Sequence, residues 1–305
     1  MLASIVFFAV NVLMLRGITL HCPAADGYVA SVYRGFWGLL AVWLAFRGRG
    51  FQPGRLVTRP ILLLRGGVGA AGILLFYLTI EHLGAGRATI INLTYPIFGA
   101  LMAALWLKER LSLRQLGWMV AALGGLVVFF ADTALHAQIS RHELLAALGA
   151  VVAGLAVVLI RVLGRSEHAS TIYASQCIWT VVVAMPMCLD RLFKLPTWAV
   201  LGLVLASLMV TAGQLALTQA FRHLSVAMGS SLQMLLPVMI AVGGVTLFGE
   251  TFTRIEVLGA IATLFATWRS INQGVRHKEA ARNDAPPFRE VRHGNLVGDP
   301  PRTTV

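Results

Sequence analysis

Apolar stretches of about 20 residues recur along most of the chain, and they constrain the fold more than any other feature. A helix needs roughly 20 apolar residues to cross the hydrocarbon core of a bilayer. The stretches are continuous rather than alternating, so a barrel of transmembrane strands fits them poorly. Hydrophobic residues make up 57% of the chain and charged residues only 12%, which is too few polar side chains to cover a soluble domain. Ten spans are predicted, at about 2–20, 27–46, 60–80, 86–107, 113–131, 143–163, 171–189, 196–220, 224–248 and 254–272.

The basic residues predict how these spans are oriented. If the N-terminus is cytoplasmic, 17 of the 25 Lys and Arg residues fall on the cytoplasmic side and 5 on the outer side. This asymmetry follows the positive-inside rule and places both termini in the cytoplasm. Residues 273–305 are polar and contain few large apolar side chains, so they are predicted to form a disordered cytoplasmic tail.

A pair of residues is repeated at a fixed distance in the two halves of the chain. Pro96 precedes Glu109 by 13 residues, and 141 residues later Pro237 precedes Glu250 by the same spacing. The match indicates an internal duplication, with one unit at 1–131 and the other at 143–272. Because five spans per unit is an odd number, the second unit enters the membrane upside down. The predicted fold is therefore all-α and integral to the membrane, with ten transmembrane helices in two inverted five-helix repeats.

The repeated residues have distinct expected roles. Pro96 and Pro237 fall in the middle of spans, where a missing N–H weakens the helical ladder, so they are interpreted as hinge or cavity-shaping residues. Glu109 and Glu250 close their helices before a tight turn and are interpreted as structural turn residues. A carboxylate at a helix C-terminus is disfavoured by the helix dipole. A nearby Lys or Arg, or the N–H groups that open the next helix, should therefore offset it.

These features resemble a known family. The mid-helix proline, the five-plus-five duplication and the segments "KERLSLRQLGWMVAALGGLVV" and "GETFTRIEVLGAIATL" are similar to the EamA-type ten-helix members of the drug/metabolite transporter superfamily. The resemblance extends over residues 2–272. It implies export of a small metabolite across the bacterial inner membrane by alternating access, through a cavity lined mainly by spans three, four, eight and nine. The first half departs from the family pattern, because Lys108 stands where the second half has Gly249.

Polar side chains within the spans are the candidates for substrate binding. Arg34 lies about eight residues inside the second span, too deep to reach water fully. Carbonyl groups, the side chains of Tyr33 or Asn11, or an anionic group of the substrate could be its partner. The further candidates on the spans that the resemblance places around the cavity are Tyr77, Asn92, Thr94, Tyr95, Gln214, Thr218 and Gln233.

The leading hypothesis is a secondary transporter for a small polar or amphipathic metabolite. No acid lies deep in a span, and no GxSxG, HExxH or paired aspartate motif is present, so no catalytic residue, metal or cofactor is expected. A non-transporting scaffold or sensor and, less well supported, a membrane-embedded enzyme stay open as alternatives. The expected partners are the substrate and the lipid bilayer, without nucleic acid, and a homodimer is left open.

Overall fold

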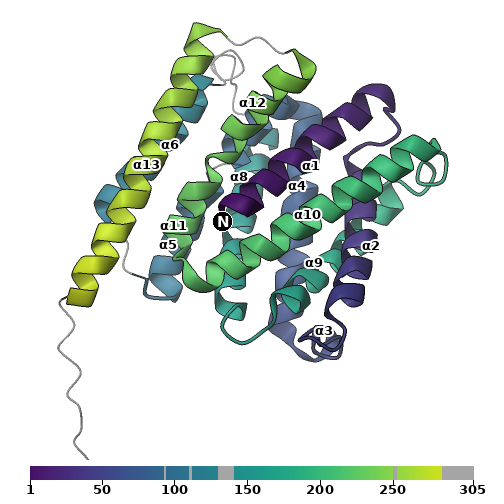
Figure 1. Cartoon of the computed structure of the whole chain (residues 1–305), viewed down its shortest axis with the longest axis horizontal. Helices are drawn as coiled ribbons and strands as arrows, with labels where there is room; N and C mark the ends of the chain where they lie inside the picture. Colours follow the sequence, from purple (N-terminus) through teal and green to yellow (C-terminus); the bar gives the residue numbers. More distant parts are fainter. Residues whose placement is uncertain (93, 110–111, 130–140, 250–252, 284–305) are drawn as a thin grey trace, which may run out of the picture.

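The computed structural model describes residues 1–92, 94–109, 112–129, 141–249 and 253–283, and this part of the chain is helical without any strand (Figure 1). The first half forms α1 (Leu2–His21), α2 (Gly27–Phe46), α3 (Arg55–Thr58), α4 (Pro60–Asn92), α5 (Tyr95–Trp106) and α6 (Leu113–Phe129). The second half forms α8 (Arg141–Leu163), α9 (Ala169–Ala184), the 3₁₀ turn η1 (Met185–Met187), α10 (Thr197–His223), α11 (Val226–Gln233), α12 (Leu236–Phe248) and α13 (Arg254–Asn283).

The repeated prolines lie directly after breaks in the helical ladder. Pro96 is in the first turn of α5, which begins after the break that follows α4. Pro237 is in the first turn of α12, after α11 has ended at Gln233. A proline is tolerated in the first turn because the N–H it lacks has no helical partner there. The sequence placed both prolines within continuous spans, whereas the structure divides each of these spans into two helices.

Helix α4 contains 33 residues, but it does not run straight. Leu75 lies against Gly149 of α8, and Tyr95, just beyond the end of α4, lies against Gly154. A straight helix would separate residues 75 and 95 by about 30 Å, whereas five residues of α8 span only about 8 Å. The chain therefore reverses direction between Leu75 and Tyr95. Such a reversal is needed for spans three and four to cross the membrane in opposite directions.

The packing of the helices reveals the internal duplication. Helix α1 packs against α10 and α12, and its counterpart α8 packs against α4 and α5. In the same way, α2 contacts α10 while its counterpart α9 contacts α4. The pairs α2 with α9 and α6 with α13 each join a helix to its own counterpart, and α5 packs against α11, which precedes its counterpart α12. The fold is thus two inverted repeats of five transmembrane helices, as the odd number of spans per repeat predicts.

Helices α6 and α13 lie side by side at one edge of the bundle (Figure 1). They approach closely where a Cβ added at Gly125 would be 2.6 Å from the backbone nitrogen of Thr263. Small residues at such crossings are typical of helix packing in membranes. Helix α13 continues to Asn283, which corrects the prediction that order ends near residue 272. Lys, Glu, Ala and Arg in this last part are good helix formers and extend the helix. The rest of the predicted tail, 284–305, lies outside the described residues.

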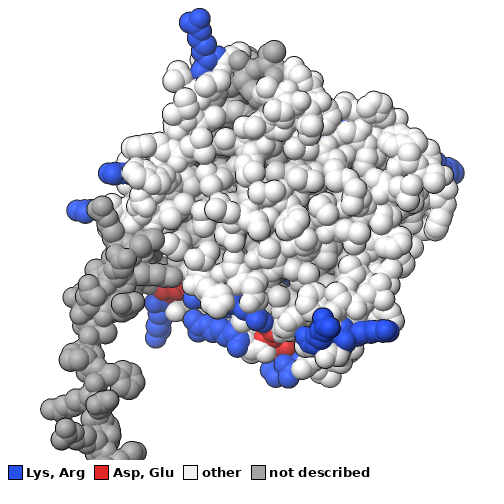
Figure 2. Space-filling model, viewed as in Figure 1, with Lys and Arg blue, Asp and Glu red and all other residues white. Residues whose placement is uncertain are grey.

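The outer surface of the bundle suits a lipid environment. Five of the described helical segments are long and apolar enough to cross a membrane singly, namely Leu2–His21, Gly27–Phe46, Arg141–Leu163, Thr197–His223 and Val226–Phe248, the last of which combines α11 and α12. Large apolar side chains such as Leu144, Leu201 and Leu247 are exposed on it. Figure 2 shows a broad face without charge and a row of Lys and Arg side chains along its lower edge. The protein is therefore a multi-pass membrane protein.

Candidate functional site

Arg34 reaches from α2 towards the second half of the chain. Its Nη2 donates to the side-chain oxygen Oε1 of Gln214 on α10, at a long distance of 3.5 Å. Arg34 also lines a small cavity of about 20 Å³, which has room for about one water molecule. The other residues around this cavity are Asn11, Leu15, Ala30, Ala206 and Ser207. Asn11, considered a possible partner of Arg34, instead donates to the carbonyl of Ala206 at 2.8 Å.

Arg65 on α4 is a second cation inside the bundle. Only 2% of this residue is exposed, and its Nη2 donates to Oε1 of Gln176 on α9 at 3.0 Å. Its Nε and Nη1 groups are buried and have no hydrogen-bond partner among the described residues. Gln176 is followed by Cys177, whose carbonyl lies against Gly35, the residue next to Arg34 on α2. Gly69 makes space for Arg65, because a Cβ at this position would lie 2.3 Å from Nη1.

Arg65 is not among the binding residues predicted from the sequence. It is one of the three arginines that fall within predicted spans, and it lies five residues after Pro60. The long side chain of an arginine that close to a span end can reach the interface, so its position alone does not indicate a buried site. The glycine at position 69, one helical turn later, could have indicated that the side chain is accommodated inside the bundle instead.

Neutral polar groups from the second half lie beside α2 one turn after Arg34, where a Cβ at Gly38 would be 2.7 Å from the hydroxyl of Tyr173. The hydroxyl of Tyr173 on α9 lies 3.2 Å from the hydroxyl of Thr211 on α10, and both residues are buried. Thr211 in turn donates to the carbonyl of Ser207 at 2.7 Å. These groups, with Gln176, Gln214 and the two arginines, are called the central polar layer below. Its members come from α2 and α4 in the first half and from α9 and α10 in the second.

The central polar layer contains two cations and no anion. Among the described residues, Arg65 and Glu167 are the charged residues whose side chains are buried. Glu167 is engaged elsewhere, because both of its carboxylate oxygens accept hydrogen bonds from Arg55, at 3.1 and 3.0 Å. The layer therefore carries a positive charge that the described side chains do not neutralise, and it favours an anionic guest.

The predicted binding residues do not all gather around Arg34. Gln214 contacts Arg34 directly, and Thr218 lies one turn further along α10, where its hydroxyl donates to the carbonyl of Gln214 at 2.8 Å. Gln233 is buried and its Nε2 lies 3.7 Å from the sulfur of Met1, in a different contact. Three other candidates lie around the break before α5, namely Asn92, Thr94 and Tyr95. The side chain of Tyr77 lies outside the described residues.

Glu109 belongs to a network at the end of the bundle predicted to be cytoplasmic. Its carboxylate accepts from Nε of Arg161 on α8 at 3.2 Å and from the backbone N–H of Val226, the first residue of α11, at 3.0 Å. Arg161 also donates to the carbonyls of Phe221 and Arg222 at the end of α10, at 2.7 and 2.6 Å. The expected Arg and helix N–H partners are thus present. They belong to the second half, however, and not to the helix that follows Glu109.

A second contact closes the same end of the bundle. Arg55 and Arg59 form ion pairs with Glu167 at 3.0 and 3.9 Å, which connects α3 to the start of α9. The adjacent residue, His168, accepts a hydrogen bond from the N–H of Ser170 and caps α9. Burial, together with the nearby charge of Arg222, lowers the pKa of His168.

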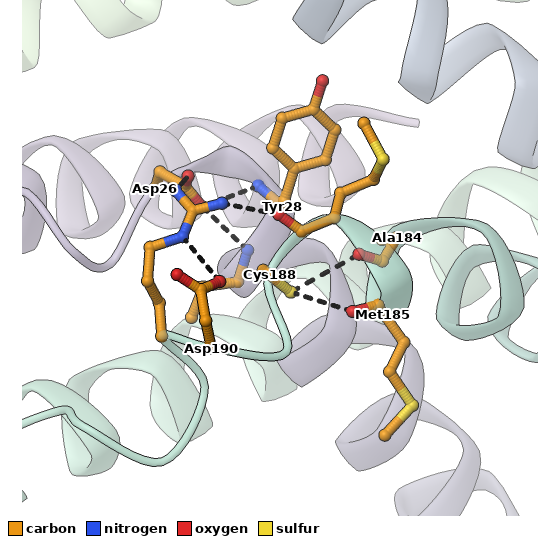
Figure 3. A network of polar contacts seen from close by, with 9 residues as sticks. Asp26, Tyr28, Ala184, Met185, Cys188 and Asp190 are labelled. Atoms are coloured by element: carbon orange, nitrogen blue, oxygen red, sulfur yellow. Dashed lines mark hydrogen bonds and ion pairs between the residues drawn. The ribbon is translucent and has the colours of Figure 1, made fainter.

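An ion pair links the halves at the opposite end (Figure 3). Asp26 caps α2 by accepting from the N–H groups of Tyr28 and Val29, and its second oxygen accepts from Arg191. Arg191 also donates to the carbonyl of Met187 at 2.6 Å. The carboxylate of Asp26 raises the pKa of Arg191.

The turns that end α5 and α12 have the same backbone conformation in both halves. Gly249 has a φ of 65°, and Lys108, at the equivalent position, has a φ of 52°. A left-handed residue commonly ends a helix and is usually glycine. Glu109 follows the first of these turns, whereas Glu250, after the second, lies outside the described residues.

The chain is similar to a family of transporters and to individual proteins that are named as transporters. The model of the EamA-like transporter family matches residues 1–131 and 141–271. The pseudopaline exporter CntI of Pseudomonas aeruginosa is 31% identical over 225 residues, covering 73% of this chain and 76% of the relative. Solute carrier family 35 member G1 of Mus musculus is 28% identical over 195 residues, covering 58% of this chain and 52% of the relative. A solved crystal structure covers 90% of this chain and 98% of its own, with a TM-score of 0.70 and 16% identity, which supports the fold alone.

Proposed function

The chain belongs to the EamA-like transporter family, and from this premise we propose that it is a secondary transporter that exports a small polar or amphipathic metabolite by alternating access. As a member of this family, it is a transporter of the drug/metabolite transporter superfamily. Export is supported by one relative, whose name describes an exporter. The bacterial inner membrane is the proposed location.

The observation that carries the alternating-access proposal is the position of the ion pairs. Three ion pairs between residues far apart in the chain each join the first half to the second. Arg161 with Glu109 and Arg55 with Glu167 lie on one side of the central polar layer, and Arg191 with Asp26 lies on the other. A relative rotation of the halves would break the contacts at one end while keeping those at the other. The cavity beside Arg34 is too small for a metabolite, so opening at one end is needed for a substrate to enter.

The breaks before Pro96 and Pro237 support the same mechanism. They occur at equivalent positions in the two repeats, and α5 packs against α11, the helix that precedes the second break. A broken helix can bend at low cost because its hydrogen-bond ladder is already interrupted. We therefore assign these prolines a hinge role, in which each repeat bends its own broken helix as one end opens.

Uptake by liposomes that contain the purified protein tests the transport function. Amino acids, nucleosides, vitamins and organic acids are supplied as labelled compounds, and liposomes without protein serve as the control. Flux of one class of compound that depends on the protein supports the proposal. Adding the compound outside the liposomes, and in a second experiment loading it inside, reveals whether transport runs in both directions. Absence of flux for every class in correctly inserted protein would favour the scaffold or sensor alternative.

The proposed orientation places both termini in the cytoplasm, because the basic residues are concentrated on that side. A reporter that works only in the cytoplasm tests this orientation, and it should be active when it is fused at Val305. Activity restricted to a reporter that requires the outer side would contradict the proposed orientation.

A further inference from the structure

We propose that Arg34 and Arg65 form one anion site that binds a metabolite with two acid groups, such as a dicarboxylate. Gln176 and Gln214 hold the two guanidinium groups while no anion is bound. This assignment rests on the proposed transport function for its biological meaning, but it concerns a binding site that can be examined without transport.

The hydrogen bonds of Arg65 carry most of the argument. A guanidinium group has five N–H donors, and in Arg65 the Nε and Nη1 groups are buried without a described partner. A buried charge that is only partly bonded is costly. Gly69 also leaves Nη1 without a side chain against it on that face. An arginine that is buried, charged and incompletely bonded is therefore suited to receive an anion.

The two glutamines explain why the site can stay open for a ligand. Each arginine contacts an amide oxygen from the second half, at 3.0 Å for Gln176 and at 3.5 Å for Gln214. A neutral amide oxygen is a weaker partner for a guanidinium than a carboxylate. A glutamate in either place would neutralise its arginine permanently, whereas a glutamine can be displaced by an acid group of the substrate.

The two positive charges select the charge of the ligand. Arg65 donates to Gln176, and the carbonyl of the next residue, Cys177, lies against Gly35 beside Arg34, so the two cations flank the same segment of α9. No described buried acid offsets them. A ligand with two acid groups can offer one to each guanidinium, and planar carboxylates match its forked N–H groups. A ligand with a single acid group would leave one arginine without a charged partner.

The decisive variant is Gln176→Glu, which places a carboxylate beside Arg65 at almost unchanged volume. If Arg65 only ties α4 to α9, this change strengthens the tie and leaves ligand binding intact. If Arg65 is part of an anion site, the new carboxylate occupies the site and excludes the ligand. Gln115→Glu is the matched control, because Gln115 is also buried but lies on α6, where it faces Gly274 of α13.

The measurement is the melting temperature of the full-length protein in detergent with succinate or glutarate, at constant ionic strength. Their neutral diamides, succinamide and glutaramide, are the matched probes. At ten times the dissociation constant, the acids should raise the melting temperature of the wild type by roughly 3 °C. The diamides should have no effect. Arg34→Gln and Gln176→Glu should not respond to the acids, while Gln115→Glu should respond like the wild type.

The assignment is overturned if neither acid stabilises the wild type, or if Gln176→Glu and Arg34→Gln respond as the wild type does. Arg65→Gln adds a further comparison if it folds, and the other two variants decide the question if it does not. The transport function is judged separately by the liposome screen. A wild type that transports a neutral metabolite and ignores both acids would keep the function and lose this site. Acid-dependent stabilisation without any flux would keep the site and reject transport.

Discussion

The two halves of the chain pack their helices in the same way, but they contribute different side chains to the interface between them. Their helices pack in equivalent pairs, and their broken helices carry a proline in the same first turn. The first half, however, supplies the two arginines of the central polar layer, while the second half supplies Gln176, Gln214 and Thr211. With the 141-residue offset, Arg65 corresponds to Ala206. Duplication therefore accounts for the fold, and the departures from symmetry lie at the proposed anion site.

The largest effect is expected from removing a cation of the first half. Arg34→Gln should lower transport in liposomes by roughly 10- to 100-fold, since a hydrogen bond to a charged group contributes about 1.5 to 3 kcal/mol. Arg34→Lys keeps the charge but loses the forked geometry, so it should retain part of the flux. Wild-type flux in a normally inserted Arg34→Gln protein would remove Arg34 from the site. Failure of both variants to fold would assign it a structural role.

The next largest effect concerns the ion pairs that join the halves. Glu109→Gln should lower the free energy of unfolding by roughly 2 kcal/mol, because Arg161 and the N–H of Val226 both lose a charged acceptor. Asp190→Asn is the control, since the side chain of Asp190 is 73% exposed and pairs only with neighbouring Arg191. This control should change stability by less than about 0.5 kcal/mol. If the two variants lower the free energy of unfolding equally in denaturant, contacts between the halves contribute no more to stability than an exposed ion pair.

A smaller effect is expected at the two equivalent turns. Lys108 adopts a left-handed conformation that costs a residue with a side chain about 1 kcal/mol, whereas Gly249 adopts it freely. Lys108→Gly should therefore raise the free energy of unfolding by up to about 1 kcal/mol, and Gly249→Ala should lower it by a similar amount. Thermal unfolding of the two variants measures both. A destabilised Lys108→Gly protein would mean that contacts of the lysine side chain outweigh the backbone strain.

The smallest effect is expected from a pH gradient. No acid of the described residues lies within the central polar layer of either half, so no carboxylate there can carry a proton with the substrate. Flux into liposomes should change little when a gradient of one pH unit is imposed at constant membrane potential. Proton movement in a fixed ratio to substrate would contradict this and would direct attention to Glu109, or to Glu81 on α4, whose side chain lies outside the described residues.

The sequence predicted the scaffold well because its signals are local and repeated. Span lengths, the Pro and Glu register and the charge asymmetry depend on residues near one another in the chain. The division of the proline-containing spans into two helices was not anticipated, although both prolines were correctly paired. The prediction of disorder from residue 273 is wrong up to Asn283, because polar residues with high helix propensity extend α13.

The candidate site was harder to predict because it depends on contacts between distant residues. Arg34 and Gln214 were both selected, but nothing in the sequence indicated that they face each other across 180 positions. Arg65 and Gln176 are not among the predicted binding residues, and Gln176 lies outside the spans that the family resemblance places around the cavity. The partners of Glu109 had the expected chemistry, but they come from the other half. Such pairings are set by how the repeats pack.

The most direct test of the account measures the distances between the two halves at both ends of the bundle. Spin labels are attached to cysteines at Val57 and Arg165 for one end and at Leu20 and Phe193 for the other, all exposed positions, in protein whose three buried native cysteines are replaced. Pulsed electron paramagnetic resonance then reports each distance in the wild type, Glu109→Gln and Asp26→Asn. We expect Glu109→Gln to lengthen the first distance alone and Asp26→Asn to lengthen the second alone. Distances that stay fixed in both variants, or that lengthen together, would contradict a transporter whose two halves open alternately around the central polar layer.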